Sequence, residues 1–103
     1  MPYREGMTPI MRRALLAIFI FGADVEYWYN GSLHIKHPGI RKFPDGMDVP
    51  LRIHWNTTWA CQCKGMIKSY YLYGDILSVK GMEFIKTLPE YKWACNAKTA
   101  CQL

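Results

Sequence analysis

The chain has 103 residues, of which half are apolar and 15% are aromatic, and it carries a formal net charge of +5. This length is enough for a single domain, residues 1–103, and the apolar content excludes intrinsic disorder. No apolar run reaches the roughly 18 residues that span a bilayer, and nucleotide-binding, kinase, hydrolase and metalloprotease motifs are absent, so we expect a non-enzymatic protein without a membrane span.

The first predicted element is a helix from Thr8 to about Phe21. Thr8 is a favourable N-cap residue, and Pro9 suits the first helical position. Apolar residues then recur at three- and four-residue spacing through Ile18, and Gly22 is a natural end. The pattern predicts a helix that packs into the core.

A β-hairpin is predicted next, because two β-prone segments flank Asn30-Gly31. A two-residue turn there pairs Tyr27 with His34 and Trp28 with Leu33. Side chains alternate between the two faces of a strand. We expect one face, directed to the core, to hold Trp28, Leu33 and Ile35. We expect the other, outer face to hold Tyr27, Tyr29, His34 and Lys36.

The second half of the chain predicts more strands and a helical tail. Residues 49–55 alternate and predict a strand with Val49, Leu51, Ile53 and Trp55 inward. Residues 66–73 and 76–80 predict a second hairpin around Gly74-Asp75, residues 81–88 a short helix, and residues 90–103 a weaker helical tail.

Together these elements predict an α+β fold. An N-terminal helix and a short C-terminal helix pack on a largely antiparallel, meandering sheet of about five strands. We expect the core to contain Ile18, Trp28, Leu33, Ile35, Ile53 and Ile85.

The four cysteines form two pairs, Cys61 with Cys63 and Cys95 with Cys101. Four-thiolate zinc sites usually have two to four residues between the members of each pair, whereas one and five occur here. Free thiols are favoured, and two disulfides or a zinc site formed by all four cysteines are the alternatives. No other cofactor is expected.

The compartment bears on the disulfide alternative, because disulfides persist only in oxidising surroundings. Arg12-Arg13 and the apolar residues 14–23 have the pattern of a signal peptide. Phe21, however, occupies a position where a cleavage site at Ala23 requires a small residue. We therefore expect a cytoplasmic protein, with secretion as the alternative.

The basic excess lies in the C-terminal half of the chain. Residues 49–103 hold seven basic and three acidic side chains, against six and five in residues 1–48. An acidic partner is therefore expected to meet this half. Aromatic and basic residues are interleaved in two predicted partner-binding centres. The first contains Tyr27, Tyr29, His34 and Lys36, and the second contains Lys68, Tyr71 and Tyr73.

These centres predict a small binding module that inhibits or occludes a protein partner with an acidic surface. Tyrosine and tryptophan are enriched at protein interfaces, and small viral proteins that act on host factors are often of this kind. The first alternative is a basic nucleic-acid-binding protein, because the same tyrosines and lysines can stack on bases and contact phosphates. The second alternative is a secreted, disulfide-stabilised domain.

Overall fold

The computed structural model describes residues 6–28, 30–36, 42–68 and 76–101, and within them it combines four helices with a small antiparallel sheet. The helices are α1 (Pro9–Phe21), α2 (Trp55–Cys63), α3 (Val79–Lys86) and α4 (Tyr91–Cys101). The strands are β1 (Val25–Tyr27), β2 (Leu33–Ile35) and β3 (Arg52–Ile53), and the 3-10 helix η2 (Gly22–Asp24) joins α1 to β1. The predicted α+β class is confirmed.

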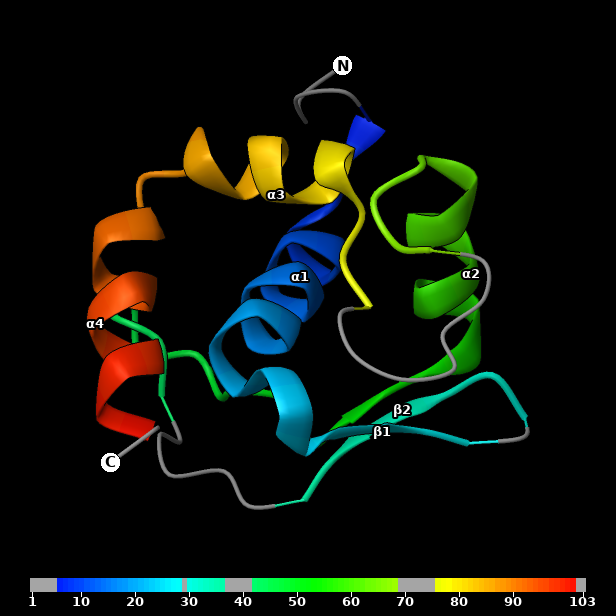
Figure 1. Ribbon diagram of the computed structural model, residues 1–103, viewed down its shortest axis with the longest axis horizontal. Helices are drawn as coiled ribbons and strands as arrows, with labels where there is room; N and C mark the ends of the chain where they lie inside the picture. Colours follow the sequence, from blue (N-terminus) through cyan, green and yellow to red (C-terminus); the bar gives the residue numbers. More distant parts are fainter. Residues whose placement is uncertain (1–5, 29, 37–41, 69–75, 102–103) are drawn as a thin grey trace.

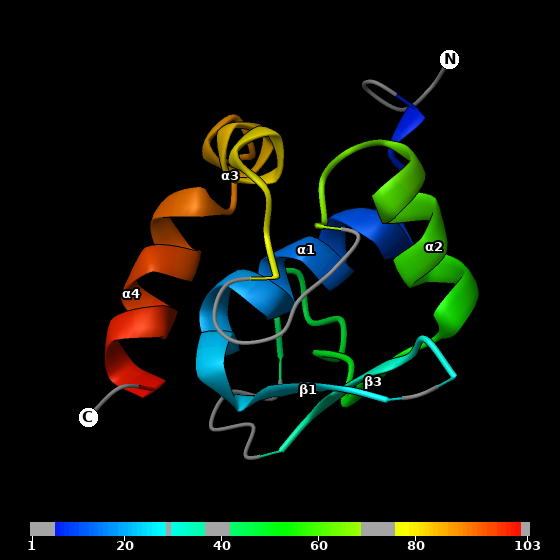
Figure 2. The same ribbon diagram turned by 45° about the vertical axis from the view of Figure 1, so that its right-hand side comes forward.

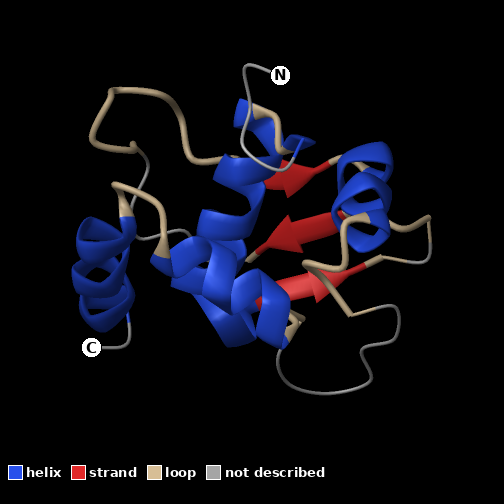
Figure 3. Ribbon diagram, turned by 90° about the horizontal axis from the view of Figure 1, so that it is seen from above, coloured by secondary structure: helices blue, strands red, loops and turns tan. Residues whose placement is uncertain are grey.

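Helix α1 lies at the centre of the molecule, with the sheet below it and α2 and α4 on opposite sides (Figures 1 and 2). The three strands lie side by side, in the order β1-β2-β3 (Figure 3). The predicted caps of α1 are confirmed. Thr8 Oγ1 accepts a hydrogen bond from the Met11 amide at 3.2 Å, and Gly22 ends the helix with a φ of 46°.

The hairpin is confirmed, but its register differs from the prediction by one residue. Tyr27 lies opposite Leu33, and Val25 opposite Ile35. The Trp28 amide donates to the Ser32 carbonyl at 2.8 Å, so the turn between this last pair has three residues instead of two. Gly31, within the turn, has a φ of 90°. A shift of one residue exchanges the faces of β1. Tyr27 therefore lies on the core face and Trp28 on the outer face, and the predicted positions of both are wrong.

The charge of Glu26 explains this register. A two-residue turn would place Glu26 opposite Ile35, on the core face, where an ionised carboxylate without a partner is costly. In the structure Val25 occupies that position instead, and Glu26 forms an ion pair with Lys36 at 3.2 Å on the outer face. The Asn30-Gly31 pair does not distinguish the predicted two-residue turn from the observed three-residue turn, because both turns need a residue with positive φ.

The predicted strand over residues 49–55 is confirmed only at Arg52–Ile53. Leu51 and Trp55 are exposed rather than inward. Helix α2 begins at Trp55, because His54 acts as its N-cap and accepts a hydrogen bond from the Asn56 amide at 3.2 Å through Nδ1. The sequence pattern missed this helix.

The second predicted hairpin lies partly outside the described residues, which exclude 69–75. Its described part is the bridge between Ile67 and Leu77, in which the Lys68 amide donates to the Ile76 carbonyl at 2.9 Å. Helix α3 begins at Val79, so the predicted strand over residues 76–80 does not extend that far. With three strands in the described part of the chain, the expected number of about five is not confirmed.

The core surrounds α1, whose residues from Ala14 to Phe21 are all buried. Five of the six predicted core residues are buried, and Trp28 is the exception. Lys98 of α4 donates a hydrogen bond from Nζ to the Phe19 carbonyl at 2.9 Å, which satisfies one of the free carbonyls at the end of α1. Among the described helices, none is both long and apolar enough to cross a membrane.

Candidate functional site

Three of the four tryptophans are exposed; Trp28 and Trp55 lie at the turn of the β1–β2 hairpin, and Trp59 is one helical turn further along α2. The exposed fractions are 42% for Trp28, 51% for Trp55 and 62% for Trp59. We call these three residues together with His34 the tryptophan surface. Large apolar side chains exposed in a group mark interaction sites in small soluble domains.

Trp28 is held in place by a stack on His34. The two rings have centroids 3.9 Å apart and planes inclined by 16°. His34 Nε2 lies 3.3 Å from Ser32 Oγ, which in turn lies 2.7 Å from Asn30 Oδ1. Since Asn30 Oδ1 can only accept, the Ser32 hydroxyl donates to it and is left to accept from His34 Nε2. This chain of contacts orders the Trp28 ring before any partner binds.

Trp55 and Trp59 are four residues apart and therefore share one side of α2. That side meets the hairpin turn, because a Cβ on Gly31 would lie only 3.4 Å from the Trp55 Cβ. Gly31 also donates its amide proton to the Trp28 carbonyl at 2.8 Å. Trp28 and α2 thus meet at the same turn.

Helix α2 is anchored by an adjacent side. Thr58 and Cys61 are buried there, and burial raises the pKa of the Cys61 thiol from 9.0 to about 12. A thiol with such a pKa stays protonated and unreactive at neutral pH.

Exposed charges of both signs border the tryptophan surface, because Glu26 of β1 lies opposite His34 and is paired with Lys36 at 3.2 Å. Arg52 lies opposite His34 in the sheet and is exposed. Residues 49–74 contain Arg52, Lys64 and Lys68 but no aspartate or glutamate. Among the described residues Arg52 forms no ion pair, so it offers an unpaired positive charge beside the tryptophan surface.

The structure separates the residues of the first predicted binding centre. His34 and Lys36 lie on the outer side of the sheet, as expected. Tyr27 does not, because it packs against the core and its hydroxyl accepts a hydrogen bond from Gln62 Nε2 at 3.2 Å. Tyr29 lies outside the described residues. In the second centre Lys68 is exposed, whereas Tyr71 and Tyr73 lie outside the described residues.

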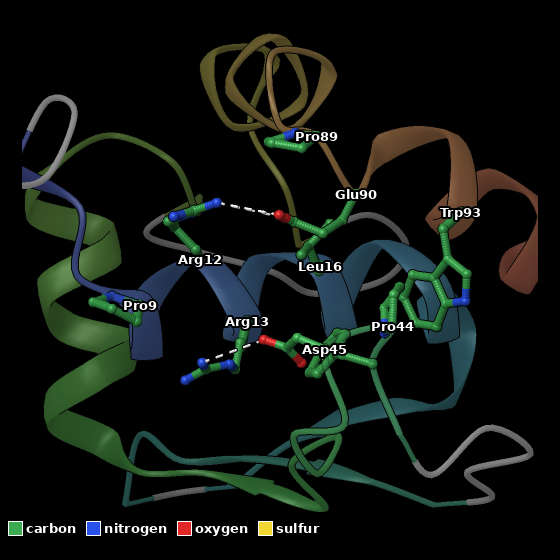
Figure 4. A pocket seen from close by; sticks show the side chains of 10 residues that line it. Pro9, Arg12, Arg13, Leu16, Pro44, Asp45, Pro89, Glu90 and Trp93 are labelled. Atoms are coloured by element: carbon green, nitrogen blue, oxygen red, sulfur yellow. Dashed lines mark hydrogen bonds and ion pairs between the residues drawn. The ribbon is translucent and has the colours of Figure 1, made fainter.

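A separate pocket of about 500 Å³ lies over the N-terminal half of α1 (Figure 4). Residues 43–45 form one wall, and residues 89–93 form the other. An ion pair spans each side: Arg12 with Glu90 at 3.2 Å, and Arg13 with Asp45 at 3.8 Å. The lining residues come from three segments far apart in the sequence, so no local motif marks this pocket.

The three cysteines whose side chains are described do not gather into the zinc site that was one alternative. Cys61 is buried, Cys63 is exposed and Cys95 is half-buried, and all three are free thiols. The side chain of Cys101 is outside the described part of the structure. Among the described residues, no three histidine, cysteine, aspartate or glutamate side chains gather to hold a metal ion. Helices α2 and α4, which carry the two cysteine pairs, lie on opposite sides of α1 (Figure 1).

Comparison with known proteins finds no matching family model, no matching curated protein and no matching solved structure.

Proposed function

We propose that the protein is a non-enzymatic binding module that occludes a protein partner through its tryptophan surface. The observation that carries this proposal is the exposure of Trp28 and Trp55 at one hairpin turn, with the exposed Trp59 one helical turn further along α2. Tryptophan dominates the binding energy of protein interfaces, because its large rigid ring buries much apolar area at a small entropic cost.

The partner is expected to present an apolar pocket with acidic groups at its edge. The three indole rings would enter the apolar part, and Arg52 would lie at the rim. Basic groups at a rim speed the encounter with an acidic partner and add less to the final affinity.

A protein partner is favoured over nucleic acid by the positions of the sheet residues. Tyr27 was expected to stack on bases, but it lies on the core face. Lys36 was expected to contact phosphates, but it is paired with Glu26. Nucleic-acid binding is therefore the alternative that the experiment below has to distinguish from protein binding.

The test begins with affinity capture from an extract of the source cells, with and without nuclease. The captured partner is then purified, and its Kd is measured by calorimetry. Replacing both Trp28 and Trp59 with alanine should raise the Kd by about thirtyfold or more, because interface hot spots contribute at least about 2 kcal/mol. The control is Val79→Ala, since Val79 is 80% exposed on α3.

Equal Kd values for the double variant and the Val79 variant would refute the proposed interface. Loss of the captured material on nuclease treatment would favour the nucleic-acid alternative. In that case affinity should also fall steeply with salt concentration.

We propose the cytoplasm as the compartment. Three thiols are free, and Cys61 is enclosed in the core as a protonated thiol. Free cysteines of this kind are typical of reducing surroundings, where disulfides are rare. Measuring the mass of the natural protein after thiol alkylation, without reduction, tests this assignment.

A further inference from the structure

The pocket over α1 is separate from the tryptophan surface, and its lining is that of a small-molecule site. Its volume of about 500 Å³ lies within the range of such sites, roughly 300–1,000 Å³. Leu16, Phe43 and Trp93 supply apolar surface. In Figure 4 Leu16 lies between the two ion pairs, and Trp93 lies toward one end of the pocket.

The two ion pairs differ in how closely they are joined. Arg12 Nη2 lies 3.2 and 3.5 Å from the two carboxylate oxygens of Glu90, so this pair is hydrogen-bonded, while Arg12 Nε is buried and has no hydrogen-bond partner in the described part of the chain. Arg13 Nη2 lies 3.8 Å from Asp45 Oδ2, which is too far for a hydrogen bond. Within the described part of the chain Arg13 donates no hydrogen bond, and Asp45 accepts one only from the Met47 amide, through Oδ1.

Arg13 and Asp45 therefore present an unused donor and an unused acceptor side by side at the pocket. The pocket as a whole carries two positive and two negative side chains, so it favours neither a simple anion nor a simple cation. Its charges are complementary to a molecule that carries one charge of each sign.

We propose that this pocket binds an aromatic α-amino acid as a zwitterion. The ligand carboxylate accepts hydrogen bonds from Arg13, and the ligand ammonium group donates to Asp45. The aromatic ring covers Leu16 and packs toward Trp93. Arg12 and Glu90, joined through Arg12 Nη2, hold α1 against the start of α4.

The probe is L-tryptophan, titrated into protein labelled with nitrogen-15 and followed by NMR at the indole N–H signals. The Trp93 signal, assigned with a Trp93→Phe variant, should move with a Kd of about 1 mM, the affinity typical of a ligand of this size. The signals of Trp28, Trp55 and Trp59 should stay in place, since these residues lie outside the pocket. No movement of the Trp93 signal at L-tryptophan concentrations up to ten times the expected Kd would overturn the proposal.

Three derivatives of the same ring test the role of each charge. N-acetyl-L-tryptophan keeps only the carboxylate, L-tryptophanamide keeps only the ammonium group, and N-acetyl-L-tryptophanamide keeps neither. Each should bind at least about fivefold more weakly than L-tryptophan, because each loses a charge-assisted hydrogen bond. Equal binding of any derivative would overturn the zwitterion assignment.

Matched variants test the two residues. Arg13→Gln and Asp45→Asn should each raise the Kd for L-tryptophan about fivefold, while Arg52→Gln, on the sheet, should leave it unchanged. Thermal melting of all three variants shows whether each is folded. Unchanged affinity in the folded Arg13 and Asp45 variants would overturn the proposal, and this result would not bear on the tryptophan surface.

Discussion

Gly81 offers a sharp test of how closely α3 approaches the rest of the core. It lies in the first turn of α3 and is buried against the backbone of Met66. A Cβ at this position would overlap the Met66 carbonyl oxygen and lie 3.0 Å from the carbonyl carbon. Helix propensity favours alanine over glycine by about 0.5–1 kcal/mol. Propensity therefore predicts that Gly81→Ala raises the free energy of unfolding, whereas packing predicts that it lowers it.

The magnitude follows from what holds Met66 in place. Its side chain is buried, its amide donates to the Cys61 carbonyl at 3.0 Å, and its own carbonyl accepts from the Ser78 amide at 3.1 Å. Moving α3 away breaks the bond to Ser78, which costs about 1–3 kcal/mol, and overpacking costs a further 1–3 kcal/mol or so. After the gain in propensity we expect a net loss of about 2–4 kcal/mol in the free energy of unfolding.

Urea unfolding followed by tryptophan fluorescence measures this loss. In thermal unfolding the same loss corresponds to a fall in Tm of roughly 10–25 °C for a domain of this size. The control is Lys80→Ala at the preceding exposed position, which should change the stability by less than about 0.5 kcal/mol. A Gly81→Ala variant more stable than the wild type would refute the close approach of α3 to Met66.

Two further predictions concern the core. Because burial raises the pKa of Cys61 from 9.0 to about 12, the folded protein holds this proton more tightly than the unfolded chain. The contribution of Cys61 to stability is therefore fully present below pH 9 and should fall by up to about 1.4 kcal/mol per pH unit above it. The free energy of unfolding, measured with urea between about pH 8 and 11, should fall more steeply with pH in the wild type than in Cys61→Ala. Equal pH dependence in the two proteins would contradict the burial of the thiol. Ile18→Ala should lower the free energy of unfolding by about 2–5 kcal/mol, because Ile18 is buried in α1. The control is Ile10→Ala on the exposed side of the same helix, which should lower it only slightly. A similarly small loss in both variants would contradict the central position of α1.

The elements predicted well from sequence are those whose signals are local. Helix α1 is marked by Thr8 and Pro9 at its start and Gly22 at its end, and the structure places all three as expected. The hairpin is marked by Asn30-Gly31 in the same way. Helix α2 was missed, because the alternation from Val49 continues through Trp55 and imitates a strand. Burial of one side of α2 decides its structure, and burial is a tertiary effect.

The candidate site was predicted only in part, for a related reason. His34 and Lys36 were placed correctly on the outer face, since strand alternation fixes them once β2 is identified. Trp28 and Trp55 were assigned inward by strand alternation, although Trp55 and Trp59 share a spacing of four residues that fits one side of a helix. The exposure of a large apolar residue depends on the space available in the core.

The hairpin register connects the fold to the proposed interface. The shift of one residue that turns Glu26 outward also turns Tyr27 inward, where its hydroxyl accepts a hydrogen bond from Gln62 of α2. That bond ties α2 to the hairpin, and the absence of a side chain on Gly31 lets the start of α2 approach the turn. The same shift exposes Trp28 beside the helix that carries Trp55 and Trp59. In the register of a two-residue turn, Trp28 would fill the core and Tyr27 would point away from α2. The tryptophan surface therefore exists because an acidic side chain in β1 has to face water.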